Sequence, residues 1–348
     1  MKKLKIGFVG VGFMGQRAHL ANYTEILECK VTVIAEARET LGHKVAARYG
    51  IETVCRNHME LIKKHKPDAI VASQPYKHHI NLIPDILNAG IPVFTEKPLS
   101  LSVENGKILA ALSLKTGTLH MVGYHKRSDP AVEYAKSIID TWKLSGDFGK
   151  MKYIRITMPP GDWKRNTDSV IKTDDVYPDV TMESTVPGFN SDETFKYDTF
   201  VNYYIHQVNL MRYLFGESYH LSYADPSGVL LSVQSKSGVC GVIEMATFKN
   251  TTDWQESVMV CFEKGYINID LPAPLAVHTS GKVTIMRDNG VVNPSYEIPI
   301  LPNISAMRNQ AKNFIAAVNG DRPAPCESIE AVEDLKIARD YINMMKQY

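Results

Sequence analysis

The chain has 348 residues, 44% hydrophobic and 22% charged, which is typical of a globular protein large enough for two domains. Its formal net charge of +1 gives no reason to expect nucleic acid or an anionic membrane as a partner. The five cysteines are scattered without C-x-x-C spacing, which argues against a disulfide framework or structural zinc and favours a cytoplasmic protein. No apolar run reaches the ~18 residues of a membrane span, and Lys5 interrupts the first one, so we expect no secretory signal.

The first third of the sequence alternates strand-like and helix-like patterns. Short β-branched or apolar runs predict strands at 4–9, 31–35, 69–73, 91–95 and 118–124. Amphipathic runs predict helices at 13–28, 40–49, 59–65, 78–88 and 103–115. This alternation favours right-handed crossovers, and predicts an α/β Rossmann domain with a doubly wound parallel sheet over residues 1–124.

The pattern changes near residue 125, and residues 125–348 are predicted to form a second, α+β domain for substrate binding and oligomerisation. Helices are predicted at 131–144, 201–215, 306–319 and 329–346, the last of them packing back on the first domain. A strand at 150–158 and several strands within 221–299, separated by turn signals, predict an antiparallel or mixed sheet. Residues 159–197 have no period and are rich in Pro, Gly, Asp and Thr, which indicates a long loop or lid.

The sequence GFVGVGFMG at 7–15 follows the first predicted strand directly. In a strand–turn–helix context Gly10 permits the tight turn, Gly12 lets the backbone approach a pyrophosphate, and Gly15 allows helix and strand to pack closely. Glu36 ends the second predicted strand, where a carboxylate accepts hydrogen bonds from the adenine ribose and repels a 2′-phosphate. These features predict NAD as the cofactor, while Arg38 keeps NADP possible.

A second motif, TEKPLS at 95–100, follows the fourth predicted strand. Ligands bind at the carboxyl ends of strands in such sheets, so Lys97 is placed to stabilise a substrate oxygen as charge develops on it. We expect a cis Lys97–Pro98 peptide bond in the tight turn beside this site. The alternative for Lys97 is a surface lysine before a helix.

Several segments, taken in order, resemble the glucose–fructose oxidoreductase / inositol dehydrogenase / rhizopine catabolism (Gfo/Idh/MocA) family. Besides the glycine motif and Glu36, they are QPYKHH at 74–79, AGIPVFTEKPLSLS at 89–102, MVGYHKRSDP at 121–130 and YIHQVNLMRYLFGE at 204–217. The resemblance covers the whole chain. It implies a Rossmann domain, a second domain with a large open-faced sheet that forms a homodimer or homotetramer, and NAD(P)-dependent chemistry at a ring carbon of a sugar, cyclitol or polyol.

The resemblance also assigns residues. It implies that Pro75 and His79 lie by the cofactor, that Lys97 within Glu96-Lys97-Pro98 is catalytic, and that His206 is the general acid and base. Together with the glycine motif, it predicts cofactor contacts from Gly10, Gly12, Phe13, Met14, Gly15, Glu36, Arg38, Gln74, Pro75, His79, Glu96 and Lys97.

The helix that carries His206 departs from the family pattern. Asn202 and Asn209 stand where the family usually has Asp, and Tyr204 stands where it has Gly. Without the carboxylate, the pKa of His206 should be lower than in ordinary members. Asn202 can still bind a hydroxyl or orient the imidazole, so we expect a catalytic role for it, but the substrate pocket must differ in shape.

The expected mechanism has His206 take a hydroxyl proton while Lys97 stabilises the oxygen. Predicted substrate contacts are Lys97, Tyr124, Lys126, Arg127, Trp163, Asn202, Tyr204 and His206. Two other functions stay open: an epimerase or eliminase that uses NAD transiently, and a catalytically inactive NAD- or sugar-sensing regulator. No metal site is expected, because the adjacent His78 and His79 diverge on a helix and have no supporting cluster.

Overall fold

The chain forms two compact units that do not follow one another simply along the sequence. The computed structural model describes residues 3–164, 170–245 and 252–347. Unit 1 consists of residues 1–124, 166–198 and 310–335. Unit 2 consists of residues 125–165, 199–309 and 336–348. Part of the predicted loop, 165–169, and the end of one predicted strand pattern, 246–248, lie outside the described residues.

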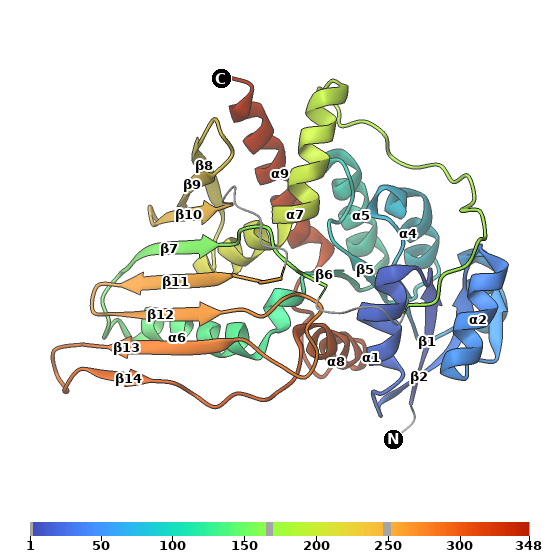
Figure 1. Cartoon of the computed structure of the whole chain (residues 1–348), viewed down its shortest axis with the longest axis horizontal. Helices are drawn as coiled ribbons and strands as arrows, with labels where there is room; N and C mark the ends of the chain where they lie inside the picture. The colour runs from blue at the N-terminus through green and yellow to red at the C-terminus, as the bar shows by residue number, and fades with distance from the viewer. Residues whose placement is uncertain (1–2, 165–169, 246–251, 348) are drawn as a thin grey trace. The chain divides into compact units, whose positions relative to one another are not determined.

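Unit 1 is built on a parallel sheet of six strands in the order β3-β2-β1-β4-β5-β6 (Figure 1). The strands are β1 (Leu4–Val9), β2 (Cys29–Ala35), β3 (Thr53–Cys55), β4 (Ala69–Ala72), β5 (Val93–Glu96) and β6 (His120–Gly123). Every pairing in this sheet is parallel, and the strand order reverses between β1 and β4. This confirms the doubly wound sheet predicted from the sequence, and it puts a ligand-binding switch point at the carboxyl ends of β1 and β4.

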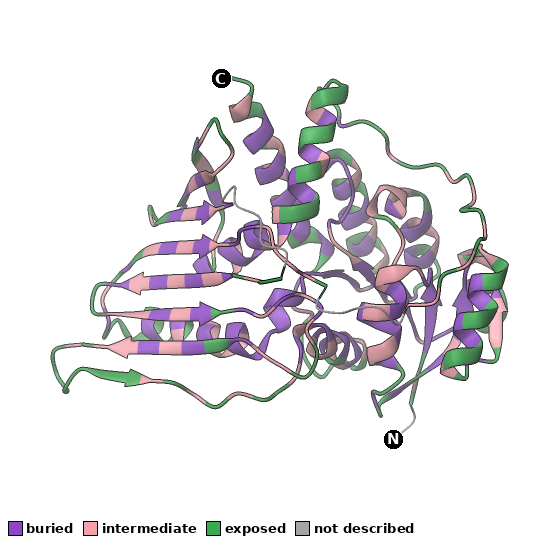
Figure 2. Ribbon diagram, viewed as in Figure 1, coloured by how far each residue is buried: buried purple, intermediate pink, exposed green. Residues whose placement is uncertain are grey.

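Helices cover the strands of unit 1, so its sheet is buried. They are η1 (Gly15–Leu20), α1 (Ala21–Tyr23), α2 (Glu39–Tyr49), α3 (His58–His65), η2 (Tyr76–His78), α4 (His79–Asn88) and α5 (Val103–Thr116). Every residue of β4 and of β6 is buried (Figure 2), as parallel strands with both faces covered require. From α8 (Ala306–Asn319), Phe314 joins this core with its ring centroid 5.8 Å from that of Phe94.

Unit 2 is built on a mixed sheet of eight strands in the order β14-β13-β12-β11-β7-β10-β9-β8. The strands are β7 (Met151–Thr157), β8 (Tyr219–Ala224), β9 (Leu230–Ser235), β10 (Cys240–Glu244), β11 (Ser257–Phe262), β12 (Gly265–Asp270), β13 (Lys282–Arg287) and β14 (Ser295–Glu297). Strands β7 and β10 pair in parallel, and the remaining pairings are antiparallel. The mostly antiparallel sheet agrees with the prediction.

One face of the unit 2 sheet is covered and the other is open. Helix α6 (Pro130–Ser145) packs on β12 and β13. From α7 (Ser191–Phe215), Met211 and Phe215 press so closely on Gly241 of β10 that a Cβ there would lie 2.9 Å from each. Along β11 buried and half-exposed residues alternate strictly (Figure 2), which is the pattern of a sheet with one open face.

Two predicted helix boundaries are wrong. The helix predicted over 13–28 ends at Tyr23, because β2 pairs Cys29 with Leu4 of β1 and the chain must turn back before that point. The helix predicted from 201 already begins at Ser191 as α7. There Asn190 and Glu193 form a capping box, in which each side chain accepts from the other's backbone N–H at 2.9 and 2.8 Å.

The other differences concern strands that were not singled out. Strands β3, β8 and β14 lie at sheet edges and are short or largely exposed, so their patterns are weak. Strand β12 carries a readable alternation, with Ile267 and Ile269 buried between half-exposed neighbours. The closing helix α9 (Ser328–Met345) lies within one residue of its predicted bounds at each end.

Candidate functional site

The turn between β1 and η1 has the shape that a phosphate-binding loop requires. Gly10 has a φ of +85°, which favours glycine. A Cβ on Gly15 would lie 2.6 Å from Ser73 Oγ and 2.7 Å from the Gly10 carbonyl oxygen, so only glycine fits. A Cβ on Gly12 would meet nothing closer than Arg38 Nη2 at 3.6 Å, so the backbone there is open to a ligand. The loop therefore fits the pyrophosphate of a dinucleotide.

Glu36, which follows β2, is folded against this loop. Its Oε2 accepts a hydrogen bond from the Val11 backbone N–H at 2.9 Å. Arg38 donates to both carboxylate oxygens, from Nε at 2.8 Å and from Nη2 at 3.0 Å. This hydrogen bond raises the pKa of the Arg38 guanidinium. The acid predicted to select NAD thus lies beside the glycine turn, and the arginine that kept NADP possible is paired with it.

A cavity of about 100 Å³ opens next to Glu36, between the carboxyl ends of β2 and β4. Its inner wall includes Val9, Ala35, Ala37, Asn57, Gln74 and Leu82. It is far larger than the roughly 10–15 Å³ that a single water needs. Glu36, Arg56, His58 and His78 also line it, so aliphatic and polar side chains together offer a suitable environment for a planar base with polar edges.

Lys97 follows the last residue of β5, at the same carboxyl edge of the sheet. Its peptide bond to Pro98 is cis, which confirms the prediction. The Lys97 backbone N–H lies 3.2 Å from Glu96 Oε2, and Glu96 Oε1 lies 2.6 Å from His19 Nε2. Burial raises the pKa of Glu96, but the hydrogen bond with His19 and the charge of Lys97 outweigh it, so the pKa is lowered. His19, absent from the predicted site, helps hold this carboxylate in place.

The remaining residues predicted to line the cofactor differ in exposure. Phe13, Met14 and Gln74 are half-buried and Pro75 is exposed. His79, however, has no exposed surface, and its Nδ1 lies 2.9 Å from the Leu99 carbonyl oxygen. His79 thus supports the chain just beyond Lys97, and its direct contact with the cofactor stays a prediction.

His79 and His120 are two fully buried histidines of unit 1. Burial lowers the pKa of His79 to about 4 and that of His120 to about 3. His120 Nε2 lies 3.0 Å from Thr95 Oγ1 in β5. Both imidazoles are neutral at physiological pH, so they support the segment around Lys97 without adding charge to it.

In unit 2, His206 lies on α7 against a second histidine. The rings of His206 and His125 meet edge to face with centroids 4.4 Å apart. Asn202, one turn earlier on the helix, is exposed, while Tyr204 donates a hydrogen bond to the Met245 carbonyl oxygen at 3.0 Å. The tyrosine that replaces the family glycine is therefore anchored to the chain after β10.

A buried charge network includes Gln207, the residue that follows His206 on α7. Lys126 Nζ contacts Glu256 Oε2 at 2.5 Å, and both side chains are at most 4% exposed. Gln207 donates to Glu256 Oε1 at 2.7 Å. The sequence did not point to Glu256 or Gln207; an acidic residue just before the alternating strand β11 is only a weak signal.

Lys126 and Arg127 were predicted to contact substrate, and the structure gives them other partners. Arg127 is 3% exposed, and its Nε donates to Asn209 Oδ1 at 2.7 Å. Lys126 is held by Glu256 as described. Tyr124 is also buried, at 2% exposed. All three are buried, and their direct contact with substrate stays a prediction.

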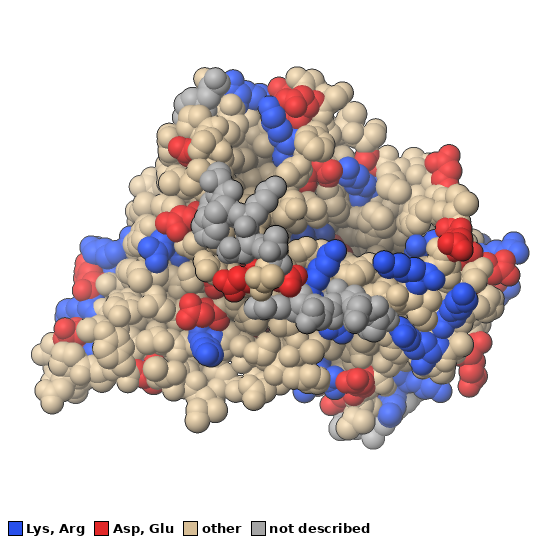
Figure 3. Space-filling view, in the orientation of Figure 1, with Lys and Arg blue, Asp and Glu red and all other residues tan. Residues whose placement is uncertain are grey.

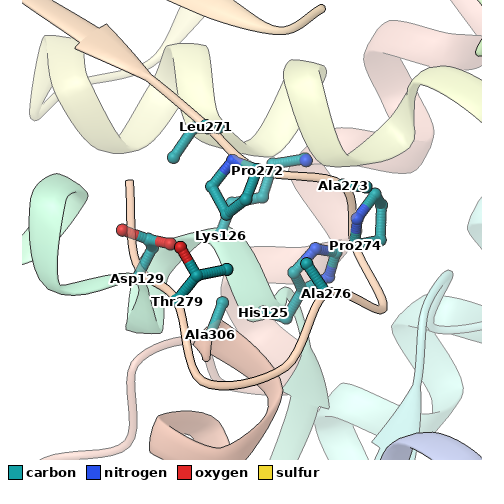
Figure 4. A pocket seen from close by; sticks show the side chains of 10 residues that line it. All are labelled: His125, Lys126, Asp129, Leu271, Pro272, Ala273, Pro274, Ala276, Thr279 and Ala306. Atoms are coloured by element: carbon teal, nitrogen blue, oxygen red, sulfur yellow. The ribbon is translucent and has the colours of Figure 1, made fainter. Parts of the chain in front are cut away.

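A small cavity of about 10 Å³ lies beside Lys126 and Asp129 in unit 2, with room for about one water. The proline-rich turn at 271–276 wraps around it (Figure 4). Asp129 begins α6 and accepts from the backbone N–H groups of Ala131 and Gly281, at 2.9 and 3.0 Å. Burial raises its pKa to about 6. This cavity is too small to admit a sugar.

Trp163, which was predicted to contact substrate, is half-buried, and its carbonyl oxygen accepts a hydrogen bond from the Leu275 N–H at 3.2 Å.

On the face drawn in Figure 3, basic and acidic side chains are interspersed. Within the described ranges, no helix is long and apolar enough to cross a membrane. Among those same residues, no group of three or more His, Cys, Asp or Glu is arranged to hold a metal ion.

The structure thus gathers the predicted site into two halves. Unit 1 brings the glycine turn, Glu36 and Lys97 to one edge of a parallel sheet. Unit 2 carries His206 with His125, Asn202 and Tyr204 on or beside α7. The meeting of Lys97 with His206 at one substrate stays a prediction.

Comparisons with known proteins bear first on unit 1. Residues 4–124 match a family model, GFO_IDH_MocA, described as an oxidoreductase family with an NAD-binding Rossmann fold. The chain is 22% identical to the uncharacterized oxidoreductase YrbE of Bacillus subtilis, over 97% of this chain and 93% of that protein. It is 23% identical to myo-inositol 2-dehydrogenase of Thermotoga maritima, over 77% and 75%.

A solved structure extends the likeness in fold. Scyllo-inositol dehydrogenase from Lactobacillus casei, with bound NAD(H) and scyllo-inositol, superposes with a TM-score of 0.70. The alignment covers 99% of this chain and 98% of that one, at 17% sequence identity. At this identity the likeness shows a shared fold.

Proposed function

Because its residues 4–124 place the chain in the Gfo/Idh/MocA oxidoreductase family, with an NAD-binding Rossmann fold, we propose that it transfers a hydride between NAD and a ring carbon of a sugar, cyclitol or related polyol. The observation that carries the proposal is the edge of the unit 1 sheet, where the glycine turn and Glu36 stand at one side and Lys97 at the other. Two of the similar proteins are named as inositol dehydrogenases, which supports a cyclitol or sugar as substrate.

The glycine turn and Glu36 are the residues that would hold the cofactor. Gly12 leaves its backbone open to the pyrophosphate, and Glu36 would exchange its bonds from Val11 and Arg38 for bonds from the ribose hydroxyls. The same carboxylate repels a 2′-phosphate, so NAD is preferred to NADP. When bound, NAD supplies or accepts the hydride.

The protein's part in the chemistry rests on a base and a cation. His206 takes the proton of the reacting hydroxyl, and its ring is oriented by His125. The Lys97 ammonium stabilises the oxygen as negative charge develops, and Glu96 fixes the backbone from which Lys97 projects. Asn202, Tyr204 and Trp163 are proposed to contact the substrate, Asn202 by a hydrogen bond to a hydroxyl.

A substrate panel tests the proposal. Purified protein is mixed with NAD or NADP and with cyclitols, sugars and sugar acids, and NADH formation is followed by absorbance. We expect at least one polyol to reduce NAD, with NAD preferred to NADP, and Glu36→Gln to weaken that preference. The proposal fails if no member of the panel is oxidised and no ketone analogue is reduced by NADH, or if NADP is the tighter ligand.

A second function is favoured by one feature, the loss of the family carboxylates at Asn202 and Asn209. Asn209 accepts a hydrogen bond from Arg127, so it is built into the structure and cannot relay a proton. An enzyme that uses NAD transiently, for epimerisation or elimination, needs no net proton release. Tightly held nicotinamide in the purified protein, together with product formed without NADH accumulation, would support this reading. Binding without any turnover would support a regulator.

We also propose that the open face of the unit 2 sheet mediates a homodimer or homotetramer. Side chains on that face include Tyr153, Val242, Met259 and Tyr266, all half-exposed. Polar side chains lie among them, since Arg155 pairs with both Val242 and Met259, so the face is mixed rather than wholly apolar, and an uncovered sheet face of this kind is a candidate interface.

A further inference from the structure

An extended segment of unit 1 lies along the edge of the sheet where the cofactor is proposed to bind. This segment, residues 171–183, is called the strap here; it contains no helix or strand. In Figure 1 it is part of the yellow-green chain that passes α2 and α4 before entering α7. By its contacts it belongs to unit 1, although it lies between two parts of unit 2 in the sequence.

The strap is fastened near both ends. At its start, Ile171 exchanges two hydrogen bonds with the Gln16 side chain in η1, at 2.9 and 3.1 Å. At its end, the Glu183 carboxylate accepts from the backbone N–H groups of Leu101 and Ser102, at 3.2 and 3.1 Å, just before α5. These bonds keep the strap across the carboxyl edge of the sheet.

Further bonds hold the middle of the strap. Asp175 Oδ2 accepts from the Leu41 N–H at 2.8 Å, at the N-terminus of α2. The Thr181 carbonyl oxygen accepts from Asn81 Nδ2 at 2.8 Å, in α4. The strap is therefore tied to the first turns of helices that begin at the ligand-binding edge.

Between these ties, Tyr177 reaches the residues of the proposed adenosine site. Its ring lies 5.0 Å from the Arg38 guanidinium carbon, and its hydroxyl donates to Gln74 Oε1 at 3.2 Å. Tyr177, Pro178 and Val180 line the cavity of about 100 Å³ that Glu36 also lines. The strap thus supplies the outer wall of that cavity.

We propose that the strap holds the adenosine half of the dinucleotide, with Tyr177 contacting the base or its ribose. This inference rests on the proposed function, because it assigns a ligand to the cavity. An empty apolar cavity of about 150 Å³ admits benzene, so a space of this order suits one aromatic ring walled by aliphatic and aromatic side chains. Glu36 lines this cavity and disfavours a 2′-phosphate, so the ligand class is an adenosine with free ribose hydroxyls.

Because the strap must move for the ligand to leave, its main effect should be on the dissociation rate. Three variants test this: Tyr177→Ala, Tyr177→Phe, which keeps the ring and loses the bond to Gln74, and the control Val176→Ala, whose side chain is 88% exposed. The probes are NADH, AMP and nicotinamide mononucleotide. Affinities are measured by fluorescence or calorimetry, and NADH release by stopped flow.

We expect Tyr177→Ala to weaken NADH and AMP binding about tenfold, mainly by faster release, and to leave nicotinamide mononucleotide unaffected. Tyr177→Phe should show a smaller loss, and Val176→Ala should behave as the wild type. In the wild type, NADH should slow hydrogen exchange of the strap amides. This exchange measurement tests the strap without any substitution.

Unchanged NADH and AMP affinity in Tyr177→Ala, or no protection of the strap by NADH, would overturn the inference. Tighter binding in Tyr177→Ala would overturn it too, because the strap would then compete with the ligand. If the wild type binds AMP and NADH through Tyr177 but oxidises no polyol, the strap assignment stands and the proposed reaction falls. A wild type that binds neither probe contradicts both.

Discussion

The two sheets of this protein bury their polar groups in different ways. In unit 1 the sheet is covered, and the buried titratable side chains include two neutral histidines, His79 and His120. In unit 2 one sheet face is open, and the interior holds a charged pair, Lys126 with Glu256. Buried neutral groups need only hydrogen bonds, whereas buried charges need a partner at close range.

This difference agrees with the function proposed for each unit. Unit 1 is proposed to present backbone N–H groups and Lys97 to an anionic cofactor, and its carboxylates near that edge are paired, Glu36 with Arg38 and Glu96 with His19. Unit 2 is proposed to orient His206, and its buried ion pair holds the next residue of the helix, Gln207, through Glu256. Each prediction below tests one part of this difference between the two units.

The largest expected effect is on the stability of unit 2. Glu256→Gln leaves the Lys126 ammonium buried without its counter-charge, which should cost about 3–5 kcal/mol of unfolding free energy. The control is Glu263→Gln, because the Lys152–Glu263 pair is solvent-exposed and should contribute little to stability. Denaturant titration of both variants measures the difference. Equal losses would mean that the buried pair has no special role.

The next effect is catalytic and centres on unit 1. Lys97→Ala should lower kcat on the best substrate of the panel by about 10²–10³-fold while NADH affinity changes little. Lys107→Ala, an exposed lysine on α5, is the control and should leave kcat unchanged. Steady-state kinetics with a separate NADH titration makes the distinction. A Lys97→Ala variant as active as the wild type would remove lysine from the mechanism.

Acid should affect the two units in opposite directions. The folded-state pKa values of His79 and His120 lie below the ordinary 6.5, so the unfolded chain binds more protons and stability falls as pH drops below that value. By pH 5 each histidine should cost about 2 kcal/mol relative to neutral pH. Asp129, with its pKa raised to about 6, should instead add about 1 kcal/mol to unit 2 on the same change.

Hydrogen exchange at pH 7 and pH 5, corrected for the intrinsic exchange rates, measures the stability of the two units separately. His79→Asn, which keeps a donor for the Leu99 carbonyl but cannot titrate, should remove about half of the acid loss in unit 1. If unit 1 keeps its full protection at pH 5, the buried histidines are not the acid-sensitive groups.

The smallest effect concerns the open sheet face. Met259→Lys puts a charge on that face and should weaken self-association at least about tenfold, or about 1.4 kcal/mol. Leu144→Lys, on α6 and 91% exposed, is the control away from the face. Light scattering over a concentration series measures both. A dimer as tight in Met259→Lys as in the wild type would place the interface elsewhere.

Much of unit 1 was readable from local pattern. Buried parallel strands are short apolar runs, and the glycine turn, Glu36 and the cis bond before Pro98 all follow from residues adjacent in sequence. The start of α7 was also encoded, in the Asn190–Glu193 capping box, but the polar composition around it hid the signal. Predictions for Lys126, Arg127 and His79 rested on residue type, whereas their burial is set by partners far away in the sequence, which no local pattern shows.

The sequence by itself determined the Rossmann unit and the resemblance to the Gfo/Idh/MocA family, and it predicted the edge of the sheet where the cofactor is proposed to bind, because each depends on periodicity and on motifs a few residues long. Only the tertiary structure decided which charged side chains are buried and paired inside the molecule. Lys126 meets Glu256 and Arg127 meets Asn209 across long separations in the chain. It likewise brought Tyr177 to Gln74, because packing, unlike local propensity, joins residues without regard to their order.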